Sequence, residues 1–284
     1  MSLKLVIPKG RMYEKVNALL ADAGIHVQGA TRNYRPKSNI ADLEIKLLKS
    51  QNIPPLVALG QHDCGFAGKD WVEEQGADVT EMLDLGFDPV RIVASIPEDW
   101  DWSEIRHKKG LIAVSEYRQL TTRWLQGQGV DFQFLRSYGA TEVFPPEDAD
   151  LVVDNTATGS TLVANRLQIV GVIMESSTCF IANNQALKDP LKKERIESMT
   201  LLFQSVLEGR NRVLLEMNCS EERLETIVGI LPAMKSPTVS KLFRQSGYAV
   251  RAAVPRDQTK DLIPRLIKAG ATDILEMPIR KVVP

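Results

Sequence analysis

A run of small and hydroxylated residues near the middle of the chain has the residue types that bind a sugar phosphate. It reads Asp-Asn-Thr-Ala-Thr-Gly-Ser-Thr over residues 154–161 and directly follows an apolar segment at residues 151–153. We expect a strand, then a loop, then a short helix. The N–H groups in the first turn of a helix lack intrahelical acceptors and bind anions. The hydroxyls of Thr158, Ser160 and Thr161 would add donors.

Two residues of this run indicate which kind of phosphorylated ligand it would bind. Gly159 lets the backbone approach a phosphate closely. The Asp154 carboxylate, at the end of the strand, can accept hydrogen bonds from two sugar hydroxyls, and ligands of open α/β sheets bind at this end. A phosphorylated ribose fits the combination better than a bare nucleotide phosphate, and the sequence contains no G-x-x-x-x-G-K-[ST] loop. The alternative is a plain strand–turn–helix corner rich in Ser and Thr.

A small basic segment follows the first apolar segment of the chain. Lys9 and Arg11 flank Gly10 in Pro8-Lys-Gly-Arg11, an arrangement that suits phosphate oxygens, although a solvated basic turn has the same composition. Lys plus Arg is 35 and Asp plus Glu is 36, so the net charge is −1. A chain without a general positive field is not expected to bind nucleic acid or an anionic membrane. Phosphate binding must therefore be local.

Two more segments combine a strand end with polar residues. Residues 63–70 contain Gly68 and Lys69 and open a helix at Asp70, which could also serve only as a helix cap. Residues 136–142 form another strand end that leads into a helix start. We expect residues 8–11 and residues 63–70 to meet the 154–161 loop.

Cysteine and histidine usage indicates neither disulfides nor a metal centre. The cysteines are odd in number and far apart, which favours reduced thiols in a cytoplasmic protein; they are Cys64, Cys179 and Cys219. The histidines have no metal-ligand spacing with each other or with cysteine, so ordinary surface or partly buried roles are favoured; they are His26, His62 and His107. The N-terminus resembles a first strand more than a signal peptide, and no apolar run approaches the ~18 residues of a membrane span.

The rest of the chain shows how these residues would be positioned. Short apolar segments alternate with amphipathic ones up to about residue 205, which predicts α/β architecture with mostly parallel sheets in two lobes. Strands are expected at residues 3–7, 64–67, 91–96, 111–114, 132–135, 151–153 and 169–174. A long amphipathic helix is expected over residues 190–209. The order after it is βαββαβ, which is the ferredoxin-like signature, and we place a domain boundary near Gly209.

Taken together and in this order, the segments resemble ATP phosphoribosyltransferases. The resemblance covers essentially the whole chain and includes the C-terminal module. The matching pieces are Pro8-Lys-Gly-Arg11, Asp63 with Gly68-Lys-Asp70, Ser115-Glu-Tyr117 with Leu120-Thr, Gly139 with Glu142, Asp154 with Thr158-Gly-Ser-Thr161, and Glu175-Ser-Ser177. Each piece alone is unspecific, but six in register with the right C-terminal module are specific.

The resemblance implies a two-lobed periplasmic-binding-protein-like (type II) catalytic core, with the active site between its lobes, and a ferredoxin-like, ACT-like C-terminal domain. Residues 1–90 and 175–209 would form lobe I, residues 91–174 lobe II with the 5-phosphoribosyl pyrophosphate (PRPP) loop, and residues 210–284 a regulatory histidine-binding domain. The implied activity joins PRPP to N1 of ATP, with release of pyrophosphate, as the first step of histidine synthesis. Histidine would be a feedback inhibitor, Mg²⁺ the cofactor, and a homo-oligomer (dimer and hexamer) the assembly.

The resemblance also implies three sets of binding residues, while no catalytic residue and no protein metal ligand is assigned. PRPP would be bound by Asp154, Asn155, Thr156, Ala157, Thr158, Gly159, Ser160 and Thr161. The ATP or pyrophosphate side would hold Lys9, Gly10, Arg11, Gly68, Lys69, Asp70 and Glu116. The histidine pocket would be lined by Asn218, Ser236, Pro237, Thr238 and Asp273.

This sequence departs from the family pattern at two of these sites. Asn218 stands where an acidic residue is expected, and residues 155–157 read Asn-Thr-Ala where Leu-Val-Ser is commoner. Three other classes remain as alternatives. A prephenate dehydratase would have a similar core and regulatory domain, but that family's Glu-Ser-Arg-Pro run is missing. A solute-binding protein would lack the C-terminal domain. An effector-binding regulator would need a helix-turn-helix segment.

Overall fold

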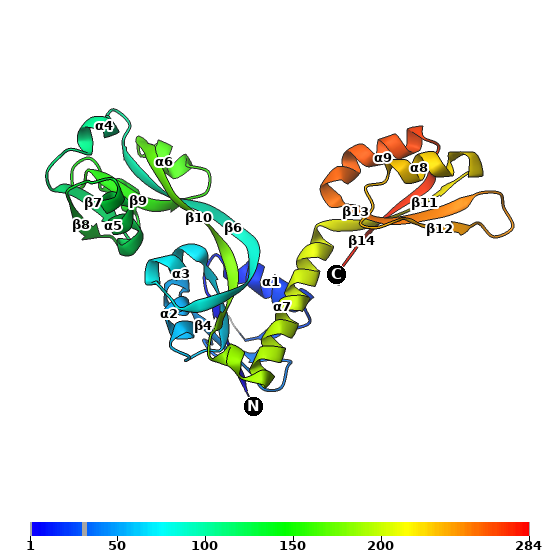
Figure 1. Ribbon diagram of the computed structural model, residues 1–284, viewed down its shortest axis with the longest axis horizontal. Coiled ribbons are helices and arrows are strands. Elements are labelled where there is room, and N and C mark those ends of the chain that lie inside the picture. Colours follow the sequence, from blue (N-terminus) through cyan, green and yellow to red (C-terminus); the bar gives the residue numbers. More distant parts are fainter. Residues whose placement is uncertain (1, 30–32, 284) are drawn as a thin grey trace. The chain divides into compact units, whose positions relative to one another are not determined.

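The computed structural model describes residues 2–29 and 33–283. These residues form two compact units (Figure 1). The first unit comprises residues 1–21 and 25–197, and the second comprises residues 22–24 and 198–284, so the division falls inside one long helix. Each unit has its own hydrophobic core.

The first unit is built on one sheet of eight strands. Their bounds are β1 (Leu3–Pro8), β4 (Leu43–Leu48), β5 (Cys64–Gly68), β6 (Val79–Pro97), β7 (Leu111–Ser115), β8 (Phe132–Arg136), β9 (Leu151–Thr156) and β10 (Leu167–Asn183). The strand order is β4-β1-β5-β10-β6-β9-β7-β8. A separate two-stranded sheet pairs β2 (Val27–Gln28) with β3 (Lys37–Ser38).

The sheet is mixed, whereas the sequence predicted mostly parallel sheets. The outer strands are parallel: β1 pairs with β4 and β5, and β7 pairs with β8 and β9. β6 runs antiparallel to both of its neighbours, β10 and β9, and β10 runs antiparallel to both of its neighbours, β6 and β5. These two central strands have 19 and 17 residues and join the two parallel groups into one sheet. The sequence prediction recognised only their segments 91–96 and 169–174.

Helices pack on this sheet and enclose buried apolar clusters. They are α1 (Tyr13–Asp22), α2 (Ile53–Ala58), α3 (Lys69–Gln75), α4 (Trp102–Ile105), α5 (Arg118–Gly127), α6 (Ser160–Ala164) and the start of α7 (Pro190–Arg210). One cluster gathers Ile92, Leu111 and Leu151 with the side chains around them, and another gathers Val6, Ile53 and Ile181. Each parallel group of strands therefore has its own core.

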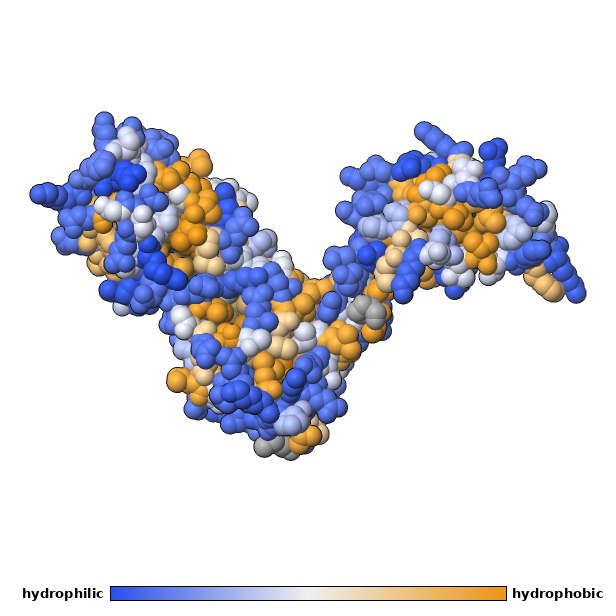
Figure 2. Space-filling view, in the orientation of Figure 1, coloured by the Kyte–Doolittle hydropathy of each residue, from blue (hydrophilic) through white to orange (hydrophobic). Residues whose placement is uncertain are grey.

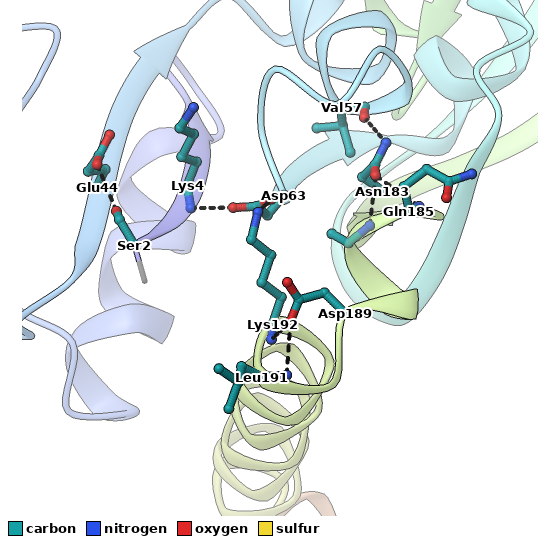
Figure 3. Close-up of polar contacts among 11 residues, drawn as sticks. Ser2, Lys4, Glu44, Val57, Asp63, Asn183, Gln185, Asp189, Leu191 and Lys192 are labelled. Atoms are coloured by element: carbon teal, nitrogen blue, oxygen red, sulfur yellow. Dashed lines mark hydrogen bonds and ion pairs between the residues drawn. The ribbon is translucent and has the colours of Figure 1, made fainter.

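A buried ion pair fixes the start of α7 to the first unit (Figure 3). The Asp63 carboxylate accepts a hydrogen bond from the Lys4 backbone N–H at 2.8 Å and lies 2.7 Å from the Lys192 ammonium group. Asp189 precedes the helix, and its side chain accepts the Leu191 N–H at 3.0 Å. The N-terminal turn of α7 is thus capped and tied to the loop before β5.

The second unit has a four-stranded antiparallel sheet with two helices on one face (Figure 1). Its elements are β11 (Arg212–Cys219), α8 (Leu224–Ile230), β12 (Thr238–Lys241), β13 (Tyr248–Pro255), α9 (Thr259–Lys268) and β14 (Thr272–Pro278), and the strand order is β12-β13-β11-β14. Alternate residues of β11, from Val213 to Cys219, are buried against the helices.

The surface seen in Figure 2 is mostly hydrophilic on both units, with hydrophobic residues scattered among the polar ones. Phe243, in the turn between β12 and β13, is the most exposed phenylalanine among the described residues, at 83%. In residues 2–29 and 33–283, no helix is long and apolar enough to cross a membrane.

Candidate active site

The polar run begins inside β9, which extends through Thr156, and continues through the turn into α6. β9 lies beside β7 in parallel register, with Ser115 opposite Val153, so both strands end at the same edge of the sheet. α6, which begins at Ser160, is the short helix that the sequence predicted after the loop. Gly159 precedes it with φ +83°, a backbone conformation that favours glycine. The loop is therefore presented at the carboxyl edge of the strands.

The loop uses part of its hydrogen-bonding capacity internally. The buried Thr156 hydroxyl accepts the Gly159 N–H at 3.0 Å, and the Thr158 and Ser160 hydroxyls bond each other at 3.0 Å. The side chains of Thr158, Ser160 and Thr161 are exposed. The Gly159 amide is thus committed to shaping the turn, while the hydroxyls at the helix start face solvent and suit an anion.

Asp154 is a partly buried carboxylate with an unusual titration. Burial raises the pKa of its carboxyl to about 6, and the negative charges of Glu142 and Glu116 act in the same direction. Hydrogen bonds from the Asn155 backbone and the Thr141 side chain oppose the rise. A carboxylate in this state gains from hydroxyl groups that donate to it, as ribose hydroxyls would.

A cavity of about 200 Å³ brings the predicted segments together. It is lined by the loop after β1, the β5–α3 corner, the end of β7, the end of β9 and the middle of β10. Its lining includes Lys9, Arg11, Gly68, Asp70, Tyr117, Asn155 and Ser176. Residues that were predicted for the nucleotide or pyrophosphate side therefore share one cavity with Asn155 of the predicted PRPP loop.

The basic segment after β1 contributes two exposed cations. Gly10 has φ +84° and turns the chain between them. The Lys9 ammonium group lies 4.7 Å from the centroid of the Tyr34 ring. Arg11 is exposed and lines the cavity. Both side chains are available to phosphate oxygens.

Lys69 lies in a different environment. Its ammonium group is 3.1 Å from Glu81 and 2.9 Å from Asp84, and it lines a second cavity of about 460 Å³ together with Arg91 and Ala157. The hydrogen bond that Lys69 donates to the Asp84 carboxylate is the main reason that the pKa of Lys69 is raised. Two carboxylates already neutralise this cation, so it contributes less free charge to a phosphate than Lys9 or Arg11 does.

Asp70 and Glu116 are both held by side chains from distant segments. The buried Asp70 carboxylate accepts from the Tyr117 hydroxyl at 2.8 Å and from the Ser176 hydroxyl at 2.7 Å. Glu116 accepts from Gln51 at 3.4 Å. Asp70 thus does more than begin α3, because it binds partners from two other elements.

Sequence reasoning missed three residues that line these cavities. Tyr117 and Ser176 were noted only as parts of matching segments, and Arg91 only as the start of a strand. Arg91 lies opposite both Thr156 of β9 and Glu175 of β10. A polar or charged residue within the long apolar β6 was the available signal.

The residues predicted for a histidine site are only partly brought together. Asn218 donates to Asp273 at 3.1 Å across neighbouring strands, and Asp273 has φ +50°. Thr238 begins β12, which β13 separates from β11. Two strand spacings of ~4.8 Å lie between those backbones, so the segment 236–238 does not adjoin Asn218 directly within one copy of the sheet.

The described residues contain no group of three or more His, Cys, Asp or Glu side chains arranged to hold a metal ion. The three cysteines are free and buried. Burial raises the pKa of the thiol in each of them.

In this mixed α/β unit, the strand ends bring together two exposed cations, two carboxylates and a hydroxyl-rich turn. This arrangement is that of an enzyme that handles phosphorylated substrates. The family model described as ATP phosphoribosyltransferase matches residues 49–205, and that of the HisG C-terminal domain matches residues 209–281. The chain belongs to the ATP phosphoribosyltransferase family, in its long form with the C-terminal domain.

Individual relatives agree with this assignment. The chain is 42% identical over 289 residues to the ATP phosphoribosyltransferase of Desulforudis audaxviator, covering 100% of both chains. It is 40% identical over 286 residues to that of Chlorobium phaeovibrioides, covering 99% of this chain and 97% of the relative. Among solved structures, the ATP phosphoribosyl transferase (HisG:HisZ) complex from Thermotoga maritima matches with a TM-score of 0.64 at 24% identity, over 71% of this chain and 98% of that chain. At 24% identity this structural match supports the fold alone.

Proposed function

We propose that this chain transfers the phosphoribosyl group of PRPP to N1 of ATP and releases pyrophosphate, in the first step of histidine synthesis. The assignment of this reaction rests on the family membership. The observation in the structure that supports it best is the cavity shared by Lys9, Arg11, Asp70 and Asn155 at the end of β9. The alternatives, a prephenate dehydratase-like enzyme or a solute-binding protein, are not favoured by the matches to relatives.

The chemistry needs positioning more than proton transfer. The bond between ribose C1 and the pyrophosphate oxygen breaks, and its electron pair leaves with pyrophosphate. The lone pair of adenine N1 forms the new bond to C1. Because that nitrogen already has a free lone pair near neutral pH, no strong base is required. Orientation of two anions and stabilisation of developing charge therefore supply the rate.

We assign PRPP to the loop from Asp154 to Thr161. Asp154 would accept the ribose hydroxyls, and the hydroxyls of Thr158, Ser160 and Thr161 would donate to the 5′-phosphate. Lys9, Gly10, Arg11, Gly68, Lys69, Asp70 and Glu116 would form the nucleotide and pyrophosphate side. Arg91 joins this assignment from the structure, because it lines the larger cavity next to Ala157.

Mg²⁺ fits the site mainly through the substrates. The cavities hold carboxylates, but Asp70 and Asp84 are already bonded to protein partners. Mg²⁺ keeps several waters and commonly binds through phosphates plus one or two carboxylates. Pyrophosphate oxygens and water would therefore supply most ligands, and the bound ion would lower the charge on the leaving group.

We further propose that residues 1–90 and 175–209 form one lobe and residues 91–174 the other, in a type II periplasmic-binding-protein topology. The two parallel strand groups joined by β6 and β10 support this division. The order β11-α8-β12-β13-α9-β14 supports an ACT-like, ferredoxin-like domain at residues 210–284. That domain would bind histidine as a feedback inhibitor. A dimer and hexamer rest on the family resemblance, and a cytoplasmic location is supported by the free cysteines.

Pyrophosphate release in the presence of ATP, PRPP and Mg²⁺ tests the activity. Thr161→Val and Asp154→Asn test the loop, because each removes one proposed contact with PRPP. Loss of a hydrogen bond to a charged group should raise the KM for PRPP about tenfold or more. Thr80→Val is the matched control, since it removes an exposed hydroxyl that bonds Asn184 at 2.7 Å. Unchanged PRPP affinity and turnover in both loop variants would show the assignment to be wrong.

A further inference from the structure

Asn155 is an exposed residue, yet both amide hydrogens of its side chain are bonded within the protein. Its Nδ2 donates to the Tyr117 hydroxyl oxygen at 3.2 Å and to Asp154 Oδ1 at 3.1 Å. Its backbone N–H donates to the same carboxylate oxygen at 2.6 Å. A primary amide supplies two such donors, whereas leucine supplies none and aspartate only acceptors. The side chain therefore bridges a tyrosine and a carboxylate, which neither leucine nor aspartate could do at this position.

Tyr117 continues the chain of hydrogen bonds in one direction. Its hydroxyl has a single hydrogen, which it donates to Asp70 Oδ2 at 2.8 Å, so it accepts from Asn155. The ring is buried, at 1% exposure, and stacks on Trp71 with centroids 4.7 Å apart. Packing on both ring and hydroxyl fixes the position of this side chain.

Asp70, in the corner between β5 and α3, is the last member of this series of hydrogen bonds. Its Oδ1 accepts from the Ser176 hydroxyl at 2.7 Å, and its own N–H donates to Ser176 Oγ at 3.0 Å. A Cβ atom at Gly68 would lie 2.1 Å from Asp70 Oδ1, so the carboxylate occupies space that only glycine leaves open. The two carboxylates Asp154 and Asp70 are thus joined through Asn155 and Tyr117.

Resting on the proposed function, we infer that Asn155 and Tyr117 are positioning residues that hold the ribose-binding carboxylate Asp154 in register with the nucleotide and pyrophosphate side at Asp70. One end of this series of hydrogen bonds lies at the end of β9, where the proposed PRPP loop begins, and the other lies in the β5–α3 corner and on β10. The reacting groups of the two substrates must meet within a few tenths of an ångström, and small misplacements reduce rate strongly. Asn155 thereby gains a role that is separate from direct contact with PRPP.

The test is a double-mutant cycle with Asn155→Leu and Tyr117→Phe. Each variant breaks the same bridge, so kcat should fall about tenfold in either one, with smaller changes in the KM values of ATP and PRPP. The double variant should fall little further than the slower single variant, whereas independent roles would multiply to about a hundredfold. Matched controls are Asn184→Leu, which removes an exposed asparagine bonded to Asp78 at 2.8 Å, and Tyr138→Phe, which changes a tyrosine that is 89% exposed.

A pH profile separates positioning from a loss of folding. The Asn155 amide stabilises the ionised form of Asp154, so Asn155→Leu should move the acid limb of kcat/KM for PRPP upward by roughly half to one pH unit. Tyr117→Phe leaves the bond between Asn155 and Asp154 in place and should shift it much less. Multiplicative kcat losses, or an acid limb that does not move in Asn155→Leu, overturn the inference.

The outcomes also distinguish this inference from the proposed function. If the unaltered chain releases no pyrophosphate from ATP and PRPP, the proposed function is wrong. If the unaltered chain is active and Asp154→Asn weakens PRPP binding, but Asn155→Leu and Tyr117→Phe behave like their controls, only the positioning role is wrong.

Discussion

At the scale of single residues, Asp154 shows how a binding group lowers stability. The folded-state pKa of about 6 lies above the ordinary value of about 3.9 for an unfolded chain, so the folded protein binds the extra proton more tightly. The stability that comes with this proton is fully present below pH ~4 and is lost as the pH rises through ~6. Above that pH the folded chain holds an ionised carboxylate in a poorly solvated place.

Asp154→Asn should therefore stabilise the first unit at pH 8 relative to the unaltered chain, by on the order of 2 kcal/mol more than at pH 4.5. Denaturant unfolding followed by tryptophan fluorescence measures this, because Trp71, Trp100, Trp102 and Trp124 all belong to the first unit. Asp99→Asn is the control, because that side chain is exposed. An effect of Asp154→Asn that is independent of pH would contradict the assigned cause.

Sequence points to single residues most readily where the chemistry is contiguous. The run from Asp154 to Thr161 stands out because its polar residues follow one another directly. The bonds of Asp70 to Tyr117 and Ser176 were not predicted, because their partners are 47 and 106 residues away along the chain. A buried tyrosine or serine looks the same in a sequence whether it packs in the core or bonds a carboxylate.

At the scale of elements, a carboxylate from one helix caps another. The buried Glu74 of α3 accepts the Gln119 N–H at 2.9 Å and the Leu120 N–H at 3.0 Å, at the start of α5. Glu74→Ala would leave the buried Leu120 N–H and the partly buried Gln119 N–H without this acceptor and remove an anion from a helix N-terminus. We expect a loss of about 2–3 kcal/mol in the unfolding free energy of the first unit. Tryptophan fluorescence in a denaturant series measures it.

The neighbouring residue offers a close control for this cap. Glu73→Ala removes an exposed carboxylate that lies 3.6 Å from Arg123, and it should cost at most about 0.5 kcal/mol. Glu74→Gln keeps an oxygen acceptor without the charge and should fall between the two. Equal losses for Glu73→Ala and Glu74→Ala would show that the cap contributes nothing.

The start of α7 allows a similar comparison of two adjacent lysines. Lys192→Met leaves the Asp63 carboxylate, whose side chain is 7% exposed, without its cation. Since Lys192 is itself a quarter exposed, the loss should be about 2 kcal/mol, below the range for a fully buried pair. Lys193→Met removes only a surface pair with Glu197 at 3.8 Å and should change stability by less than about 0.5 kcal/mol. Shifts of the denaturation midpoint decide between them, and equal shifts would refute the buried pair's role.

The elements themselves were predictable to different degrees. β1, β7 and β8 were predicted within about a residue, because each is a short apolar or alternating segment between clear turns. β6 and β10 were predicted only in part, since polar residues such as Asp84 and Glu175 interrupt their hydrophobic pattern. Pairing between strands far apart in sequence supplies the stability that local pattern lacks. The mixed sheet follows from these two strands, and for that reason it was not predicted.

At the scale of the whole molecule, the second unit has a core of its own and a separate sheet. A separate core means that this unit can respond to a ligand without contributing residues to the cavity in the first unit. Feedback then requires only that histidine binds one arrangement of the units or subunits more tightly than another. The proposed regulation is thus a statement about differential affinity, and it can be tested without knowing the arrangement.

The hydrogen bond between Asn218 and Asp273 allows the most specific test of that regulation. Asp273 also accepts from the Thr272 hydroxyl at 3.1 Å and is held at φ +50°, so its carboxylate is fixed near the junction of β11 and β14. If it pairs with the amino group of histidine, Asp273→Asn should raise the histidine concentration for half-inhibition at least about tenfold. Pyrophosphate release is measured over a histidine series, with Glu276→Gln, on the same strand and exposed, as the matched control. Unchanged inhibition in Asp273→Asn would place the inhibitor elsewhere, and absence of any histidine effect on the unaltered chain would remove feedback from the proposal altogether.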